Sequence, residues 1–240
     1  MGRGGTLDAS VLVHFTNRYG GVSVSPYATN NLALHVKDNP LHVKENRRLT
    51  CKALSLPHVA SMEQVHGTQV RVVEGQCTQT YPACDGLITK EKDVALMVLV
   101  ADCIPVVLYD PKTEVIGALH VGRAGAFGGI VPHAIGLLQS TFGVEPSSLH
   151  VSLGPSIGGC CYEIGGEALV TAQKEFSTYL DGRYLNLQAL VQDQLARLGV
   201  VHVESDAPCT CCDGRYFSYR REGQTGRQAG IILQRSESGK

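Results

Sequence analysis

The sequence predicts an α/β fold in which a mixed central β-sheet is covered by helices. Three continuous apolar runs, at residues 94–101, 104–110 and 115–121, are rich in β-branched side chains, and strands covered on both faces have this composition. Residues 185–198 place leucines and valines on one helical face, as a covering helix does. No linker, repeat or low-complexity segment divides the chain. We therefore expect one domain over residues 1–240.

The elements before the central strands alternate between strand and helix. The first apolar run, at residues 12–16, predicts a strand that a turn follows. Residues 44–56 predict a helix, because leucine and alanine recur there at helical spacing. Two further strands are expected at 59–65 and 69–74, and the turn between them contains His66.

The elements after the central strands are mostly helices with short strands between them. A glycine-rich loop at 122–129 is expected to lead into a helix at 130–142. A second glycine-rich loop, at 154–166, follows a short strand and precedes another helix. The amphipathic helix described above then leads to two last strands, at 200–205 and 229–234.

The charge balance and the cysteine content exclude several classes of protein. Lys and Arg number 21 against 22 Asp and Glu, so the chain lacks the positive charge of a nucleic-acid binder. The longest apolar stretch, at 94–101, is far shorter than the roughly 20 residues of a membrane-spanning helix, and the first residues lack the apolar core of a secretory signal. The odd number of cysteines, nine, favours a reducing compartment. We expect a cytoplasmic monomer or small homo-oligomer without nucleic-acid or membrane partners.

Three polar residues end or interrupt apolar strands: His66, Cys103 and His120. Strand ends are where α/β proteins assemble their sites, and two imidazoles with one thiolate could bind a catalytic zinc with a fourth position open. The same residues could instead form a thiolate nucleophile that a histidine activates. Asp102 would serve either chemistry by orienting a histidine or a metal ligand, but a turn carboxylate at a strand end is the better explanation of this residue on its own. Taken singly, each of the three is better explained as a structural, buried residue.

Two further segments carry arginines. Arg123 lies in the first glycine-rich loop, whose backbone N–H groups could hold an anion, or it is a surface arginine. The stretch 209–228 places Arg220 and other arginines beside tyrosines, which suits a phosphate and a stacked base, or else an edge strand with solvated arginines. Cys209 and Cys212 form a CxxC pair, but no second pair accompanies it, which argues against a structural zinc ribbon.

A set of motifs spread along the chain resembles one family. The motifs are FTNRYGGVS (15–23), NLALHVKDN (31–39), ENR (45–47), QVHG (64–67), CDGLIT (84–89), ADCIPVVLYD (101–110), ALHVGRAG (118–125), GPSIGGCCYEIG (154–165) and CTCCDGRYFSYRREGQTGRQAGIIL (209–233). In this order they resemble the laccase-domain purine nucleoside phosphorylase family, formerly described as multicopper polyphenol oxidoreductases. The resemblance extends from about Phe15 to Ile232, which is nearly the whole chain.

The resemblance implies a zinc-dependent enzyme. In this family the histidine of QVHG, the cysteine of ADCxP and the histidine of the HxG loop bind one zinc at the active site, and they correspond to His66, Cys103 and His120. The implied activity is phosphorolysis of adenosine, inosine, guanosine or methylthioadenosine with phosphate to base and sugar 1-phosphate, with adenosine deamination as a second reaction. The implied fold is layered α-β-β-α.

Three arginines are expected to contact the substrate or the phosphate: Arg18, Arg123 and Arg220. Arg18 belongs to the TxRxGG motif, and Arg220 belongs to the C-terminal motif. The family usually reads HAGWRG where this chain reads HVGRAG, at 120–125, so that the arginine sits one place earlier and Ala124 occupies its usual position. The family's arginine aligns with Ala124, so we assign its role to Arg123 only because Arg123 is the adjacent residue.

Three other functions remain as alternatives. An amide hydrolase, for example a peptidoglycan-precursor editing factor, would use Cys103 and His120 without a metal. A copper oxidase would need several metal centres, whereas the nine histidines provide one candidate cluster. A non-enzymatic binding module would retain ligand binding without turnover. Metal analysis together with an adenosine and phosphate assay separates these alternatives.

Overall fold

Two β-sheets packed face to face form the centre of the molecule, a computed structural model that describes residues 3–6 and 10–236. Sheet A contains, in spatial order, β1 (Arg3–Thr6), β2 (Val11–Phe15), β14 (Gln228–Gln234), β7 (Val94–Val100), β3 (His58–Met62) and β5 (Gln79–Tyr81). Sheet B contains β13 (His202–Glu204), β10 (His150–Leu153), β8 (Ile104–Asp110), β9 (Val115–Val121), β6 (Gly86–Thr89) and β4 (Val70–Val72). Both sheets mix parallel and antiparallel pairs.

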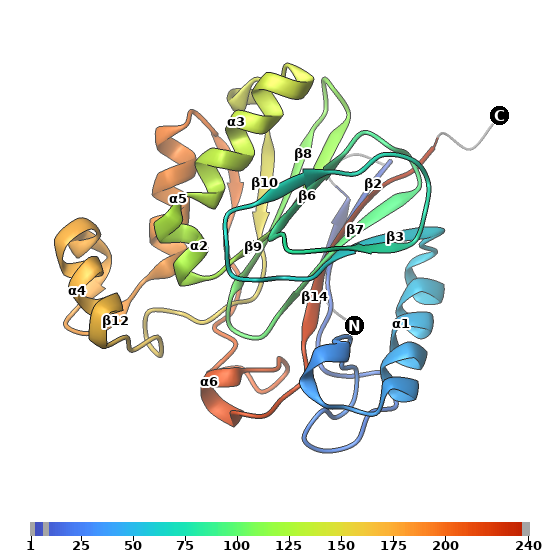
Figure 1. Ribbon diagram of the computed structural model, residues 1–240, viewed down its shortest axis with the longest axis horizontal. Helices are drawn as coiled ribbons and strands as arrows, with labels where there is room; N and C mark the ends of the chain where they lie inside the picture. Colours follow the sequence, from blue (N-terminus) through green and yellow to red (C-terminus); the bar gives the residue numbers. More distant parts are fainter. Residues whose placement is uncertain (1–2, 7–9, 237–240) are drawn as a thin grey trace.

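Helices cover the outer face of each sheet (Figure 1). On one side, α2 (Arg123–Gly128), α3 (Ile130–Phe142) and α5 (Leu187–Arg197) share a core with sheet B. On the other side, α1 (Pro40–Leu54) lies against sheet A. The remaining elements are α4 (Gly166–Glu175), α6 (Tyr219–Glu222), the short pair β11 (Leu180–Asp181) and β12 (Tyr184–Leu185), and the 3₁₀ helices η1 (Leu34–Val36), η2 (Pro146–Ser148) and η3 (Ser177–Tyr179). No described helix combines the length and the apolar character that a bilayer crossing demands.

The continuous apolar runs form β7, β8 and β9, and every residue of these three strands is buried. Successive side chains of a strand point to opposite faces. In β7, Leu96 and Val98 therefore lie in the core between the sheets, whereas Met97 and Leu99 lie in the core on the outer face of sheet A. The observed layers confirm the predicted α/β fold with mixed sheets and its α-β-β-α arrangement.

Several segments differ from the sequence-based prediction. The strands β1, β5, β6, β11 and β12 were not expected, and a helix and a glycine-rich segment differ as follows. The helix expected at 44–56 begins earlier, at Pro40, because the side chain of Asn39 caps it by accepting a hydrogen bond from a backbone N–H, with proline at the first helical position. The glycine-rich segment 122–129 was expected to be a loop and is mostly the helix α2. Its glycine at 125 serves packing, since a Cβ there would lie 3.0 Å from the carbonyl oxygen of Gly67.

Candidate metal centre and active site

The candidate site lies where strands of both sheets end at one edge. Strands β7 and β9 end there, and strands β14 and β8 begin there, as the pairs Val100 with Gln228 and Val121 with Ile104 show. The segment 101–103 crosses from β7 in sheet A to β8 in sheet B at the same edge. Residues that are far apart in the sequence are thereby brought together.

His66, Cys103 and His120 meet at this edge. His66 follows β3, Cys103 directly precedes β8, and His120 is the penultimate residue of β9. Their candidate ligand atoms lie within 4.8 Å of one another. The two imidazole rings are 4.7 Å apart between centroids and nearly perpendicular, at 82°. His120 is buried, Cys103 is half-buried and His66 is exposed, so the group is open to ligands on the side of His66.

The carboxylate of Asp85 holds both histidines in place. It is fully buried and lies 2.8 Å from Nδ1 of His120, which leaves Nε2 as the nitrogen available to a ligand. The same carboxylate accepts hydrogen bonds from the backbone N–H groups of His66, at 2.9 Å, and Gly67, at 2.7 Å. These bonds stabilise the left-handed backbone of His66 (φ 59°), a conformation that is costly for a residue with a Cβ.

Asp102 acts as a turn carboxylate after the end of β7, which is the explanation that the sequence favours over orientation of a histidine. Its carboxylate accepts hydrogen bonds from the hydroxyl of Thr210, at 2.6 Å, and from the backbone N–H of Arg220, at 2.7 Å. Asp102 therefore fixes the start of α6 and the loop before it. The orienting carboxylate is Asp85, which was not singled out from the sequence because a buried aspartate after a cysteine has no distinctive spacing.

The electrostatics of the site favour a thiolate beside a charged imidazole. Burial raises the pKa of the Cys103 thiol, but the charge of His120 and hydrogen bonds from His120 and His66 outweigh it and lower the pKa to about 6. Burial lowers the pKa of His120, but the Cys103 thiolate and the hydrogen bond that His120 donates to Asp85 raise it to about 9. Because a thiolate and deprotonated imidazoles are what a metal ion binds, an ion would displace the imidazolium proton.

The local packing leaves room for an ion among the three ligands. Gly122 stands next to them, and a Cβ at this position would lie 3.0 Å from Sγ of Cys103 and 3.3 Å from Cδ2 of His66. A side chain at residue 122 would therefore push against two of the three ligands. Two imidazole nitrogens and one thiolate sulfur are also a donor set that suits zinc. The residues present thus fit a metal ion.

A cavity of about 420 Å³ adjoins the three ligands, which line part of its wall. Other residues that line it are Tyr162, Tyr219, Arg220, Arg227 and His35. Tyrosine faces and arginine forks thus share one space with the candidate metal ligands, and its volume is in the range of small-molecule sites. A larger cavity, of about 570 Å³, lies beside α1 and is not lined by any of the three ligands.

The three arginines predicted to contact the substrate lie in different settings. Arg220 lines the cavity, and its guanidinium donates to the carbonyl oxygens of Cys161, at 3.1 Å, and Glu163, at 2.8 Å. Arg123 begins α2 and lies near Tyr162. Burial and the charge of Cys103 raise the pKa of Tyr162, whereas the charge of Arg123 lowers it. Arg18 is not among the described residues that line the cavity, and its guanidinium contacts Glu222 at 2.6 Å. A direct contact of Arg18, Arg123 or Arg220 with substrate stays a prediction.

Two residues of the cavity wall were not assigned a role from the sequence. His35 comes from η1, and its pKa is lowered by burial and then by the charges of Arg227 and Arg47. Gln64 fixes the segment before His66, because its amide exchanges two hydrogen bonds with the backbone of Leu99, at 2.7 and 2.9 Å. His35 and Gln64 both act on segments that are distant from them in the sequence, so no local sequence pattern predicts their roles.

Comparisons with known proteins agree with this architecture. Residues 12–235 match the family model described as multi-copper polyphenol oxidoreductase laccase. A Corynebacterium glutamicum protein named purine nucleoside phosphorylase is 40% identical over 231 residues, which cover 91% of this chain and 92% of that protein. The crystal structure of YlmD from Geobacillus stearothermophilus aligns with a TM-score of 0.85 and 30% identity over 95% of this chain and 93% of that chain. The crystal structure of the Bacillus licheniformis hypothetical protein YfiH aligns with a TM-score of 0.87 and 27% identity over 94% of this chain and 93% of that chain.

The family match over residues 12–235 includes every strand of the two sheets except β1 and the first residue of β2. The match includes all three candidate metal ligands and the carboxylate of Asp85. The motifs that carried the resemblance in the sequence lie within this range as well. The chain therefore belongs to the multi-copper polyphenol oxidoreductase laccase family, whose relatives include proteins named purine nucleoside phosphorylase.

Proposed function

We propose that this protein is a zinc-dependent purine nucleoside phosphorylase that cleaves adenosine, inosine, guanosine or methylthioadenosine with phosphate. The relative from Corynebacterium glutamicum that carries this name is 40% identical and covers 91% of the chain. The observation that carries the proposal is one cavity that combines a His–Cys–His ligand set with arginines and tyrosines. Phosphorolysis needs a held phosphate and a positioned purine, and the cavity offers side chains for both.

His66, Cys103 and His120 would hold the zinc ion of this proposal. Three protein ligands are typical of catalytic zinc sites, because they leave one position for a substrate oxygen or water. When bound, the ion would supply Lewis-acid polarisation of such an oxygen. Asp85 would keep Nε2 of His120 directed at the ion, as carboxylates hydrogen-bonded to a ligating histidine do at other zinc sites.

Arg227 and Arg220 are the proposed phosphate contacts. Arg227 directly precedes β14, and its Nη1 group donates to two backbone carbonyls at 2.9 Å, which fixes the guanidinium at the cavity wall. Burial lowers the pKa of Arg227, so an anion that offsets its buried charge would bind favourably. Arg220 is likewise held by two carbonyls. Two fixed guanidinium groups suit the charge and the geometry of a phosphate dianion.

Tyr162 and Tyr219 are the proposed contacts for the purine. Both line the cavity, and the guanidinium of Arg220 lies 5.4 Å from the ring centroid of Tyr162. Aromatic rings beside an arginine offer stacking surface to a base without demanding one base identity. This would permit several purine nucleosides. The proposed second reaction, deamination of adenosine, would use the same site with water in place of phosphate.

A second candidate function is a cysteine-dependent amide hydrolase that uses Cys103 and His120. The lowered pKa of Cys103, about 6, and the raised pKa of His120, about 9, describe a thiolate–imidazolium pair of the kind found in cysteine hydrolases. Asp85 would orient the histidine in this chemistry as well. This function needs no metal, and that difference separates it from the phosphorylase.

The test is base release from adenosine with and without phosphate, followed by chromatography. The phosphorylase predicts adenine and ribose 1-phosphate only when phosphate is present, and loss of both in Cys103→Ser and after chelator treatment. Cys51→Ser, a half-buried thiol in α1, is the matched control and should keep full activity. No base release from any purine nucleoside with phosphate and zinc would refute the proposal, and metal-independent amide cleavage would favour the hydrolase.

The free thiols support a reducing compartment, the cytoplasm, as the location of the protein.

A further inference from the structure

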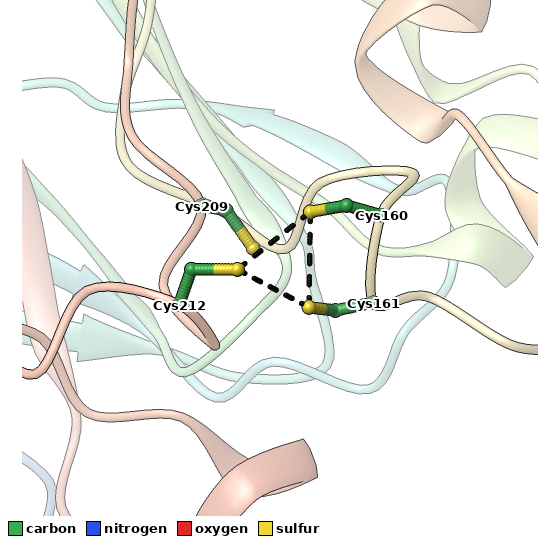
Figure 2. Close-up of side chains that lie close together, drawn as sticks. All are labelled: Cys160, Cys161, Cys209 and Cys212. Atoms are coloured by element: carbon green, nitrogen blue, oxygen red, sulfur yellow. Dashed lines mark hydrogen bonds between the residues drawn. The ribbon is translucent and has the colours of Figure 1, made fainter.

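A second group of possible metal ligands lies outside the site formed by His66, Cys103 and His120, which we call the three-ligand site. Cys160 and Cys161 belong to the segment between β10 and α4, and Cys209 and Cys212 belong to the segment between β13 and α6. We call these residues the four-cysteine cluster. Their sulfur atoms lie within 4.8 Å of one another and point toward a common centre (Figure 2). The cysteine pair that the CxxC motif lacks in the sequence is therefore supplied by two adjacent cysteines from another loop.

The distances between the sulfur atoms fit a tetrahedral ion. Sγ of Cys160 is 3.7 Å from those of Cys161 and Cys212, and Sγ of Cys161 is 3.4 Å from that of Cys212. Four sulfurs bound to zinc at about 2.3 Å stand about 3.8 Å apart, the edge of the tetrahedron. A disulfide needs about 2.05 Å between its sulfur atoms. The observed spacing is thus that of separate ligands.

The backbone around the four-cysteine cluster is arranged to hold it. The N–H of Gly158 donates to Sγ of Cys209 at 3.1 Å, a bond that favours a thiolate. A Cβ at Gly158 would lie 3.2 Å from Sγ of Cys160 and 3.3 Å from Cβ of Cys209, so a side chain there would push the two loops apart by a few tenths of an ångström. A bridge between Ser156 and Cys209 and a 3.0 Å bond from the N–H of Thr210 to Ser156 join the loops below the sulfurs.

Positive charge next to the four-cysteine cluster offsets the charge of thiolates. Arg220 donates to the carbonyl oxygen of Cys161 at 3.1 Å. Arg221 donates to the carbonyl oxygens of Cys211, at 3.0 Å, and Thr210, at 2.6 Å. Four thiolates and one divalent cation carry a net charge of minus two, and two guanidinium groups of α6 that bind backbone carbonyls of the same loops reduce the cost of holding it.

We propose that the four-cysteine cluster binds one Zn²⁺ as a closed tetrathiolate site. Binding forms four Zn–S bonds and releases one proton from each thiol that was protonated. Thiolate sulfur selects a soft or borderline ion, and four protein ligands leave no position for a substrate, so the site is structural. The inference goes beyond the proposed enzyme activity, because it concerns residues that no step of that activity uses.

The ion would connect the loop that carries Tyr162 of the cavity wall to the loop that leads into α6, whose Tyr219 and Arg220 also line the cavity. Tyr162 follows Cys161 directly and lines the cavity, and Arg220 binds the carbonyl oxygens on both sides of Tyr162. The loop with Cys209 and Cys212 leads into α6, which carries Arg220. Fixing both loops to one ion would restrict the motion of this pair of cavity residues relative to the sheets.

The test is the zinc content of each protein after reconstitution with zinc and desalting, measured by elemental mass spectrometry. Cys209→Ser/Cys212→Ser should hold one zinc per chain less than the wild type. Cys77→Ser, a half-buried thiol on a distant loop, is the control and should lose none. Cys103→Ser reports separately on the three-ligand site, so either site can fail while the other stands. Equal zinc content in the double variant and the wild type would overturn the proposal.

A measurement on the wild type covers the case in which the double variant does not fold. Cys160 and Cys212 are exposed, so as free thiols they would react readily with an alkylating agent. We expect alkylation and peptide mass spectrometry to find both protected in the zinc-loaded protein and modified after a chelator, with Cys77 modified equally in both states. Modification of both exposed cysteines in the zinc-loaded protein, or a disulfide between cluster members in protein kept under reductant, would overturn the proposal.

Discussion

Replacing Asp85 by asparagine tests how the three-ligand site is held together. Oδ1 of Asp85 serves His120 Nδ1, at 2.8 Å, and the N–H of His66, at 2.9 Å. Oδ2 serves the N–H groups of Gly67, at 2.7 Å, and Val65, at 3.3 Å. Asparagine keeps the shape but has a single acceptor oxygen, so its NH₂ group must face one of these two donor pairs.

The magnitude follows from the donors that lose their acceptor. In either orientation at least one backbone N–H next to the buried amide is left unpaired, which destabilises the fold by about 1–3 kcal/mol. If the NH₂ group faces His120, Nδ1 must accept a hydrogen bond and the proton moves to Nε2, the nitrogen required for a metal. Loss of such an orienting carboxylate lowers metal affinity by about 10–100-fold, which corresponds to about 1.4–2.8 kcal/mol.

Two assays measure these effects. Competition with a chromophoric chelator gives the zinc affinity of the three-ligand site in a Cys209→Ser/Cys212→Ser background, and urea denaturation of the metal-free protein gives the stability. Asp102→Asn is the matched control, since it also removes one carboxylate charge but contacts Thr210 and Arg220 instead of a histidine. We expect unchanged zinc affinity in this control. Wild-type affinity in Asp85→Asn would refute the reasoning.

The remaining predictions concern the same edge of the sheets. Gly122→Ala should lower zinc affinity, because its Cβ would lie 3.0 Å from Sγ of Cys103, and chelator competition measures this; unchanged affinity would mean that the ligands move freely. In metal-free protein, the alkylation rate of Cys103 should rise with pH through a midpoint near the pKa of about 6, since the thiolate forms above that pH. A midpoint near the ordinary thiol value of about 8.5 would contradict the charge pairing. Arg227→Gln should raise the KM for phosphate at least tenfold, as loss of a charge-assisted bond of about 1.5–3 kcal/mol predicts, while the KM for adenosine changes little in steady-state kinetics. Equal rises in both would argue against a phosphate contact.

The layers of the fold could be predicted because they depend on local patterns. The apolar runs that became β7, β8 and β9 are continuous, and the helix α3 has the bounds 130–142 expected from the sequence. The glycine-rich segment before it was assigned to a loop, yet it forms the helix α2, and its glycines let this helix pack closely against Gly67 and Thr68. A glycine-rich segment can be a loop or a closely packed helix, and composition alone does not distinguish the two.

The site was partly predictable for a related reason. His66, Cys103 and His120 stand out because each interrupts an apolar segment, and the structure brings all three together. Asp85 and Gly122 act only through contacts with residues far along the chain, so nothing in their surroundings in the sequence marks them. The four-cysteine cluster was missed for the same reason, since its two halves come from loops about fifty residues apart and match no compact zinc motif.

Anomalous diffraction at the zinc absorption edge, from crystals of the zinc-loaded wild-type protein, is the most direct test of the central claim. We predict a peak bonded to Nε2 of His120, Sγ of Cys103 and a ring nitrogen of His66. An active, zinc-loaded protein whose crystals show no anomalous peak among these three side chains would contradict the account.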